Sequence, residues 1–463
     1  MKISISNIGV LRQAEYELGD LTIICGRNNM GKTYATYSLY GFIDFFKNGF
    51  FPRVNKDLIT ELIHTGTCSM HIDFTQDFIN NMLKEACNAY KPFLPKIFTA
   101  QEKYFEKASF SAYVDISEIE LPNSFTSEYK RGNKDFVQIS LSHDASSLQF
   151  ALLTDAPDVN NQSLRISIGK IMGNTLKMFL FSSVFPDTFI ASAERTGAVI
   201  FKNELDYQKH NLLREIASAD EIDLGSILDK MYNTPYPLPV RRNIDFIRNV
   251  EGITKSEGIL YKKYPEVVEM YNRIIGGKYE VGRDGIRYCP DGAKSVKLQI
   301  VESASSIRSL LDVFFYLRYV AKPGDLLMID EPELNLHPES QREVARLIAA
   351  LVNIGIKVFI TTHSDYIIKE LNTLIMLKAR INNKGMKTFM AKKGYRENEL
   401  LSCKQLRVYI ADKALVQLDG NKRKSNSNTL KSAIVDDITG ISADSFNNTI
   451  NDINQIQEYI YFN

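Results

Sequence analysis

The chain has 463 residues, which is too long for one ordinary core and predicts two or three domains. Hydrophobic residues make up 44% and charged residues 24%, the balance of a soluble globular protein. Because 56 Lys and Arg residues stand against 55 Asp and Glu residues, the formal net charge is +1. This balance excludes a bulk electrostatic preference for nucleic acid or an anionic membrane, and it leaves room only for a local basic patch.

Membrane, secretory and disulfide signals are missing from the sequence. No run approaches the roughly 18 apolar residues of a membrane helix, and the N-terminal segment has no secretory pattern. The five cysteines are odd in number and scattered, without disulfide or metal-ligand spacing. We therefore expect a cytoplasmic protein with no membrane partner.

The first half of the chain alternates between strand and helix patterns. Residues 2–8 and 21–25 predict two strands, and a glycine-rich segment and a helix follow the second one. Residues 75–108 have a helical pattern, whereas β-branched residues and serines alternate between 109 and 155 as in antiparallel strands. Residues 201–275 are charged, aromatic and mostly helical, and we interpret them as an inserted arm.

The clearest local organisation lies between residues 321 and 375. Residues 326–330 (LLMID) predict a buried strand, a helix should run from Pro338 to near Gly355, and residues 358–362 (VFITT) predict the next strand. Strand, helix and strand of these lengths predict a βαβ unit of a parallel sheet. Earlier, the glycine spacing of residues 276–290 predicts a hairpin.

A glycine-rich segment between the second strand and its helix matches the pattern G-x-x-x-x-G-K-[ST]. It consists of Gly26, Arg27, Asn28, Asn29, Met30, Gly31, Lys32 and Thr33. The backbone N–H groups of such a loop surround phosphate oxygens, and the helix N-terminus adds positive potential. Lys32 would reach the β- and γ-phosphates, and Thr33 would offer its hydroxyl to Mg²⁺. The alternative is a glycine-rich turn without a ligand.

Acidic residues and a histidine follow the two strands of the predicted βαβ unit. Asp330 and Glu331 end the first strand, at the sheet edge where parallel sheets bind ligands. Asp330 could hold Mg²⁺ through water, and Glu331 could orient and polarise the attacking water. His363 follows the second strand and could bond a γ-phosphate. Each residue alone is equally compatible with an ordinary strand end that meets solvent.

In their order along the chain, these segments resemble the ATP-binding-cassette (ABC) class of P-loop ATPase heads, as in SMC and RecF-type proteins and AAA_15 and AAA_21 domains. The matching segments are CGRNNMGKT, IDEPELNLHP and FITTHSD, with ASAERTG as a weaker marker. The sequence is especially similar to ATPases of prokaryotic defence operons related to overcoming-lysogenization-defect proteins, and to the ATPase components of PARIS- and Septu-like modules. The resemblance implies an α/β fold with a mixed and parallel sheet flanked by helices, a helical insertion arm and a small C-terminal α+β region.

The resemblance also implies roles for individual residues. Walker A is implied at 26–33, Walker B at 326–330 with Asp330 on the metal, Glu331 and His363 as catalytic residues, and a D-loop that begins at Asn335. ATP and Mg²⁺ are the implied cofactors. No Q-loop can be placed. Glu194 and Arg195 suit either a coupling pair near the nucleotide or a surface ion pair.

Heads of this class also need a signature segment that a second protomer presses onto the nucleotide. The candidate is the serine-rich stretch 303–309, which precedes an apolar helix. The usual glycine after the signature serine is absent, so Ser303, Ser305 and Ser306 all stay candidates, with Ser305 preferred. The alternative is a serine-rich helix cap without a ligand.

The positions of the motifs and of the arm divide the chain into four predicted regions. An N-terminal lobe of the head spans 1–200, the arm spans 201–275, a C-terminal lobe spans 276–378, and an accessory region spans 379–463. The two lobes carry the ATP chemistry. The arm and the last region are therefore the predicted places for partner contacts.

The predicted function is that of an ATPase acting as sensor or scaffold in an antiviral defence complex. We expect it to form a homodimer of heads and to work with a separately encoded effector, a nuclease. No nuclease motif is recognisable in this chain, so we expect ATPase activity without nuclease activity. The alternative is a RecF- or SMC-like ATPase of DNA repair or maintenance. Nucleic acid is an open partner in that case, although the net charge does not indicate it.

Overall fold

The computed structural model describes residues 1–131, 134–142, 146–153, 161–201, 236–282, 285–293, 295–418, 423–442 and 455–460. These residues form two compact units. One unit comprises residues 1–4, 42–93 and 110–186. The other comprises residues 5–41, 94–109 and 187–463, and it contains all of the predicted site residues.

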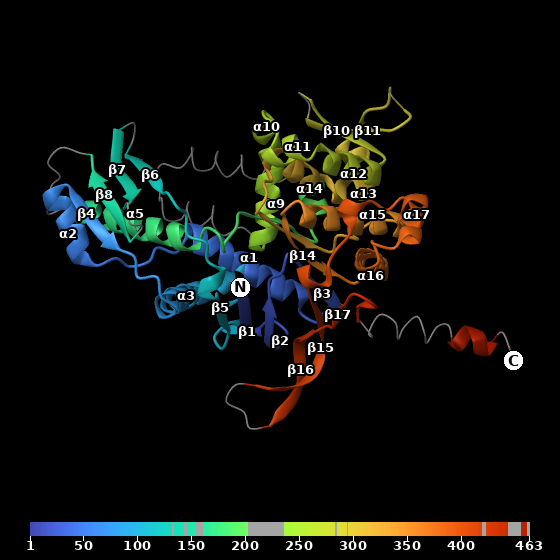
Figure 1. Cartoon of the computed structure of the whole chain (residues 1–463), viewed down its shortest axis with the longest axis horizontal. Helices are drawn as coiled ribbons and strands as arrows, with labels where there is room; N and C mark the ends of the chain where they lie inside the picture. The colour runs from blue at the N-terminus through green and yellow to red at the C-terminus, as the bar shows by residue number, and fades with distance from the viewer. Residues whose placement is uncertain are drawn as a thin grey trace, which may run out of the picture. The chain divides into compact units, whose positions relative to one another are not determined.

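A six-stranded mixed sheet forms the centre of the larger unit, in the order β16-β15-β3-β14-β13-β9 (Figure 1). Its strands are β3 (Leu21–Gly26), β9 (Thr188–Ala191), β13 (Leu326–Asp330), β14 (Lys357–Thr362), β15 (Leu406–Gln417) and β16 (Lys424–Ser432). All neighbours are parallel except β15 and β16. The α/β fold with a mixed, largely parallel sheet is confirmed, and β15 adds the region after residue 379 to that sheet.

Alternate residues of the parallel strands pack into one hydrophobic cluster with the helices. Ile23 of β3, Ile329 of β13 and Ile360 of β14 belong to this cluster, and each is at most 6% exposed. Helices that contribute to it are α12 (Pro265–Ile275), α13 (Ser305–Ser309), α14 (Leu311–Phe315), α15 (Pro338–Asn353) and α16 (Asp365–Ala379). Burial of each large apolar side chain stabilises the fold by roughly 1.5–3 kcal/mol, so this cluster fixes the sheet edge that bears the site.

The second half of the predicted arm is helical and packs on the same cluster. Residues 236–275 form α9 (Leu238–Arg248), α10 (Val250–Ile253), α11 (Ile259–Lys263) and α12. Phe246 packs edge-on against Phe189, and the guanidinium of Arg318 lies over the ring of Tyr261. These aromatic side chains are therefore used within the head. Residues 202–235, the first part of the arm, lie outside the described residues.

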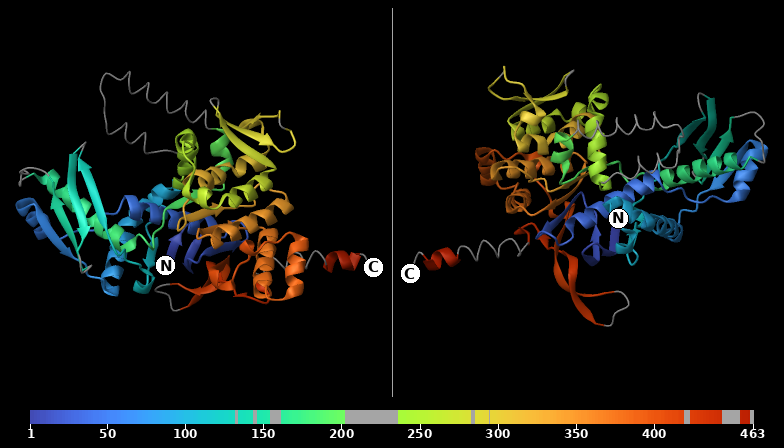
Figure 2. Two further views of the ribbon diagram at one scale, coloured as in Figure 1. Left: turned by 45° about the horizontal axis from the view of Figure 1, so that its top comes forward. Right: turned by 180° about the vertical axis from the view of Figure 1, so that it is seen from behind.

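The predicted hairpin follows these helices. Strands β10 (Gly277–Gly282) and β11 (Gly285–Pro290) pair antiparallel, and β12 (Leu298–Gln299) extends the sheet. Both views of Figure 2 show the hairpin, in yellow, beside the yellow-green helices. The hydroxyl of Tyr288 donates to the carbonyls of Ile275 and Gly276, which joins the hairpin to the end of α12. Further elements of this unit include α6 (Arg195–Ile200), α17 (Lys384–Lys393), α4 (Leu94–Phe98), β2 (Leu11–Glu17), β17 (Val435–Asp436) and β18 (Gly440–Ile441).

The smaller unit is built on a four-stranded antiparallel sheet in the order β4-β8-β7-β6, as the alternation between 109 and 155 predicts. Its strands are β4 (Thr67–His71), β6 (Thr126–Arg131), β7 (Lys134–Leu141) and β8 (Ser147–Leu152), and its helices are α2 (Lys56–Thr65), α3 (Gln76–Tyr90) and α5 (Gln162–Phe181). Strands β1 (Lys2–Ile8) and β5 (Ser109–Tyr113) each contribute residues to both units.

Helix α1 (Lys32–Asn48) follows the glycine-rich loop and contributes residues to both units. In the smaller unit, its last turn is capped by Lys177 of α5, which is 3% exposed. The Lys177 ammonium donates to the carbonyls of Phe46, Lys47 and Phe50 at 2.7–2.8 Å. A cation at a helix C-terminus satisfies carbonyls that have no intrahelical partner, so the end of α1 is held firmly.

Candidate functional site

The glycine-rich loop joins the end of β3 to the start of α1, as its sequence pattern predicts. Gly26, Asn29 and Gly31 have φ angles of 130°, 61° and 102°. A Cβ at Gly26 would lie 2.5 Å from the carbonyl oxygen of Ala411, and one at Gly31 would lie 2.5 Å from Leu11 Cγ. Glycine is therefore required at both ends of the loop, by conformation and by space.

Lys32 is the first residue of α1 and is only 6% exposed. Its Nζ donates to the carbonyl oxygens of Gly26 and Arg27, at 2.9 and 3.0 Å, so the side chain folds back across the loop. Burial lowers the pKa of Lys32, and the carboxylates of Glu331, Asp330 and Glu333 oppose that shift. A cation held across such a loop and facing three acidic groups fits a polyphosphate bound with a divalent cation.

Asp330 ends β13 beside Thr33, and its side chain is 1% exposed. Thr33 Oγ1 donates to Asp330 Oδ2 at 3.4 Å, and the hydroxyl of Thr361 on β14 donates to the other oxygen. Burial raises the pKa of Asp330 to about 6, because a buried carboxylate without a cation is costly to ionise. One carboxylate and one hydroxyl are oxygen ligands that suit Mg²⁺, which takes few protein ligands and completes its shell with phosphate and water.

Glu331, next along the chain, has an unusual backbone for a non-glycine residue, with a φ of 54°. Its N–H bonds the carbonyl of Thr361 at 3.1 Å, which holds this peptide against β14. Strained backbone of this kind costs about 1–3 kcal/mol and persists where surrounding bonds enforce it. The turn directs the Glu331 side chain toward His363 rather than along the strand.

His363 follows β14 and lies between two carboxylates. Its Nδ1 is 3.6 Å from Glu331 Oε1 and 3.3 Å from Glu333 Oε1. The close approach of the two side chains raises the pKa of His363 and lowers the pKa of Glu331. Glu333 also accepts from the backbone N–H of His363 at 2.7 Å and from the Thr362 hydroxyl at 2.8 Å. The structure thus brings the two predicted catalytic side chains together.

The sequence does not assign a role in the site to Glu333 or Thr361, and it leaves the role of Glu194 and Arg195 undecided. Glu333 and Thr361 carried no motif signal that singled them out. Glu194 accepts from Tyr37 of α1 at 3.0 Å, and its charge contributes to the raised pKa of Asp330. Arg195 is 1% exposed, so the alternative of a surface ion pair is wrong for it. The ASAERTG segment was the available signal for this pair.

The segment after β9 begins beside the end of β13. Ala191 of β9 pairs with Ile329 of β13 in parallel register. The chain that follows, from Ser192 to Glu194, therefore starts at the sheet edge that bears Asp330. Nothing in the local sequence could reveal this, because the neighbour of β9 is a strand more than 130 residues away.

The signature candidates occupy different environments. Ser303 is 5% exposed and its hydroxyl bonds the Ile300 carbonyl at 2.6 Å, whereas Ser305 begins α13 and is exposed. Asn335 is also exposed, with a φ of 61°. Within the described part of the chain, no hydrogen bond joins Ser305 or Asn335 to the glycine-rich loop. Both side chains are free to meet a second molecule.

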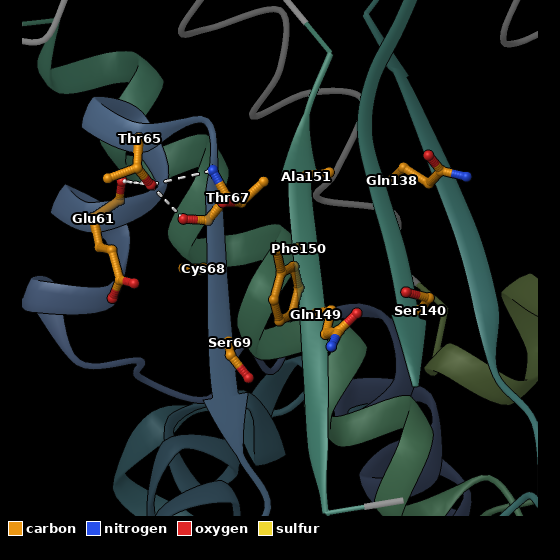
Figure 3. A pocket seen from close by; sticks show the side chains of 10 residues that line it. All are labelled: Glu61, Thr65, Thr67, Cys68, Ser69, Gln138, Ser140, Gln149, Phe150 and Ala151. Atoms are coloured by element: carbon orange, nitrogen blue, oxygen red, sulfur yellow. Dashed lines mark hydrogen bonds between the residues drawn. The ribbon is translucent and has the colours of Figure 1, made fainter. Parts of the chain in front are cut away.

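Outside this constellation, the smaller unit contains a hollow of about 570 Å³ over the four-stranded sheet, lined by both polar and apolar side chains (Figure 3). Glu61 and Thr65 of α2 line one side, and Ser69, Gln138 and Gln149 of the strands form part of its floor. None of the predicted site residues lines it. Its uncharged serine, threonine and glutamine side chains are those of an ordinary solvent-facing sheet surface.

Comparison with known families decides what kind of protein this is. Residues 1–368 match the AAA ATPase domain family, AAA_15. The chain belongs to this family. With the mixed sheet and the loop at the end of β3, the match identifies an ATPase domain of α/β fold, and the predicted fold class is confirmed. The family implies nucleotide binding. Among the described helices, none is long and apolar enough to cross a membrane.

Three solved structures are similar over most of their length. The SMC head domain from Thermotoga maritima is 9% identical with a TM-score of 0.29, and the alignment covers 94% of this chain and 98% of that one. An SmcHead bound to the C-winged helix domain of ScpA is 12% identical with a TM-score of 0.31, covering 93% and 96%. An Smc head domain with an extended coiled coil, bound to the C-terminal domain of ScpA derived from Pyrococcus furiosus, is 12% identical with a TM-score of 0.31, covering 98% of both. TM-scores this low support no conclusion about the function of this chain. No curated protein matches it in sequence.

Proposed function

We propose that this chain binds and hydrolyses ATP at the sheet edge formed by the ends of β3, β13 and β14. The observation that carries the proposal is the convergence of Lys32, Thr33 and Asp330 with the Glu331–His363 pair, from three strands far apart in the sequence. A lone glycine-rich turn would not assemble a metal-ligand pair and a carboxylate–imidazole pair beside it.

Each side chain has a distinct task in this proposal. The loop N–H groups and Lys32 bind the phosphates, while Thr33 and Asp330 would hold Mg²⁺, which supplies positive charge to the phosphate oxygens. The lowered pKa of Glu331 keeps its carboxylate ionised, so it can accept a hydrogen bond from the attacking water and orient it. His363, beside Glu331, is placed to donate to the terminal phosphate.

The experiment compares two variants in ATP binding and in turnover. Lys32→Ala removes the buried cation of the loop and should abolish binding of ATP. Glu331→Gln keeps the shape of the site but cannot act as a base, so it should bind ATP with Mg²⁺ and turn it over at least about 100-fold more slowly, the usual range for a general base. Wild-type turnover by Glu331→Gln would refute the proposal.

In this proposal, the active form is a homodimer of heads. Ser305 at the exposed start of α13 would reach the nucleotide of the partner head, since one chain has one glycine-rich loop and one signature candidate. Two identical faces would then enclose two ATP molecules around a twofold axis. Exposure of Ser305 and Asn335 supports this arrangement.

At the level of biology, we propose a sensor or scaffold subunit of a prokaryotic antiviral defence complex whose separately encoded effector, a nuclease, cuts nucleic acid. The support is the resemblance of the three motif segments to such ATPases. The purified chain should hydrolyse ATP and leave DNA and RNA intact with Mg²⁺ or Mn²⁺. Cleavage that a change outside the ATP site abolishes would contradict this division of labour.

A RecF- or SMC-like function in DNA repair or maintenance is equally compatible with the family. Salt-dependent DNA binding by the pure protein would favour it, because phosphate contacts release counterions and weaken with salt. Dependence of activity on a co-expressed neighbouring gene product would favour the defence function.

A further inference from the structure

Arg195, the first residue of α6, is among the largest fully buried side chains of the chain, with 1% of its surface exposed. Its guanidinium donates to four backbone carbonyls: Nη1 to Ser192 at 2.8 Å and to Asp330 at 2.7 Å, Nη2 to Glu331 at 2.9 Å, and Nε to Ser309 at 2.6 Å. Three separate segments, the turn after β9, the end of β13 and the end of α13, therefore meet on one side chain.

Burying a charged side chain costs free energy unless its charge is compensated. The burial of the Arg195 guanidinium at this position therefore needs an explanation. In the described part of the chain, Arg195 makes no hydrogen bond to a carboxylate. Asp312, which is 1% exposed, interacts with it electrostatically from α14. An apolar side chain would fill the space at lower cost, whereas the planar fork of arginine is suited to fixing several carbonyls at once.

Two of these carbonyls control the direction of Glu331. The Asp330 carbonyl belongs to the peptide plane before the Glu331 Cα, and the Glu331 carbonyl belongs to the plane after it. Bonds to both planes fix the φ and ψ angles between them, and φ is the strained value of 54°. Arg195 therefore holds the backbone that directs the Glu331 carboxylate toward His363, without contact to any reacting atom.

The remaining bond reaches the signature candidate. Ser309 ends α13, the helix that begins at Ser305, and its carbonyl accepts from Arg195. The Ser309 hydroxyl donates to the carbonyl of Leu334 at 3.1 Å, directly before Asn335. The end of α13 is thus tied to the turn that holds Glu331 and to the segment that presents Asn335.

We propose that Arg195 is a positioning residue that sets the direction of Glu331 and couples it to α13, so that a partner head docked on Ser305 and Asn335 orders the water-activating carboxylate. This inference rests on the proposed function. It adds a route by which pairing of the heads controls hydrolysis, whereas ATP binding at Lys32 stays independent of Arg195.

The test measures turnover, ATP affinity and the midpoint of thermal unfolding for Arg195→Lys, which keeps the charge but loses the planar fork. Turnover should fall roughly 100-fold, the effect of a displacement of about 1 Å at a catalytic group, with ATP affinity within about twofold of wild type. Arg346→Lys is the matched control, because Arg346 is also a buried arginine but bonds Glu370 on α16 instead. It should leave turnover unchanged.

A second variant decides the outcome if Arg195→Lys does not fold. Ser309→Ala removes one hydroxyl from the link to Leu334 and should lower turnover about tenfold at unchanged ATP affinity. In a double-mutant cycle, Arg195→Lys should have little further effect on single-turnover hydrolysis once Glu331 is Gln, because it acts through Glu331.

Wild-type turnover in both variants, additive effects with Glu331→Gln, or a proportional loss of ATP affinity and thermal midpoint would each overturn the inference. Failure of the proposed function is distinguishable, since it would appear as wild-type turnover in Glu331→Gln itself.

Discussion

At the residue scale, the site depends on backbone conformations that few side chains allow. Gly26 has a φ of 130° and no room for a Cβ beside the Ala411 carbonyl of β15. Gly26→Ala should therefore distort the loop, abolish ATP binding and lower the free energy of unfolding by more than about 1 kcal/mol. Calorimetric ATP titration and thermal unfolding measure both. Gly252→Ala, where nothing lies within 4 Å of an added Cβ, is the control; equal effects of the two would contradict the account.

His363 gives the site a defined pH dependence. The neighbouring carboxylates of Glu331 and Glu333 raise the pKa of His363 above 6.5, while Lys32 opposes the shift. Because the folded pKa is above the unfolded one, the stabilisation is complete below pH 6.5 and is lost as the pH rises through the folded pKa. The difference in thermal midpoint between wild type and His363→Gln should thus be largest near about pH 6 and smallest near about pH 9. A difference that grows with pH would exclude this pairing.

Single residues also show where sequence reasoning ends. Lys32, Thr33, Asp330 and Glu331 could be chosen from the sequence because each stands at a fixed place in a local pattern. The strained φ of Glu331 and the carbonyl partners of Arg195 could not, because three of the four partners lie 114 to 136 positions away along the chain. Local spacing contains no information on which segments the tertiary fold brings together.

At the scale of elements, the βαβ unit followed from periodicity and capping signals, and the glycine-rich loop followed from its sequence motif. The position of β15 in the central sheet did not, because its neighbour β3 lies almost 400 residues earlier. The charged and aromatic residues of 236–275 indicate an inserted arm rather than core, yet these helices bury Val267, Val268 and Tyr271 in the main cluster. Frequent charges on one face of a helix do not reveal what its other face covers.

An ion-pair network joins α15 and α16, the helices that follow β13 and β14. Glu370 of α16 is 3% exposed and accepts from Arg342 at 2.7 Å and Arg346 at 2.6 Å, both on α15. Glu370→Gln removes the charge that two arginines share and should lower the free energy of unfolding by about 3 kcal/mol, as expected when one partner of a buried pair is lost. Denaturant unfolding measures this change.

The matched control is Asp187→Asn, which weakens the exposed Lys322–Asp187 pair. It should cost less than about 1 kcal/mol, since exposed ion pairs contribute little. An equal loss of stability in the two variants would show that burial does not determine how much the α15–α16 ion pairs contribute to the free energy of unfolding.

At the scale of the whole molecule, the central claim is that two heads share each ATP. The glycine-rich loop and the proposed metal ligands lie at one sheet edge, whereas Ser305 and Asn335 are exposed and, within the described residues, make no hydrogen bond to that loop. A composite site explains both facts. Nucleotide-dependent closure of a pair could then change the state of whatever protein the heads hold.

The most direct measurement mixes a Lys32→Ala chain with a Ser305→Arg chain and follows ATP hydrolysis. Each variant alone should be inactive, because every site of its homodimer lacks one essential part. After equal mixing and exchange, half of the dimers have one intact site of two, so activity should return to about a quarter of the wild-type value. No recovery after demonstrated exchange, or full wild-type turnover by a monomeric preparation, would contradict the claim that two chains build the ATP site.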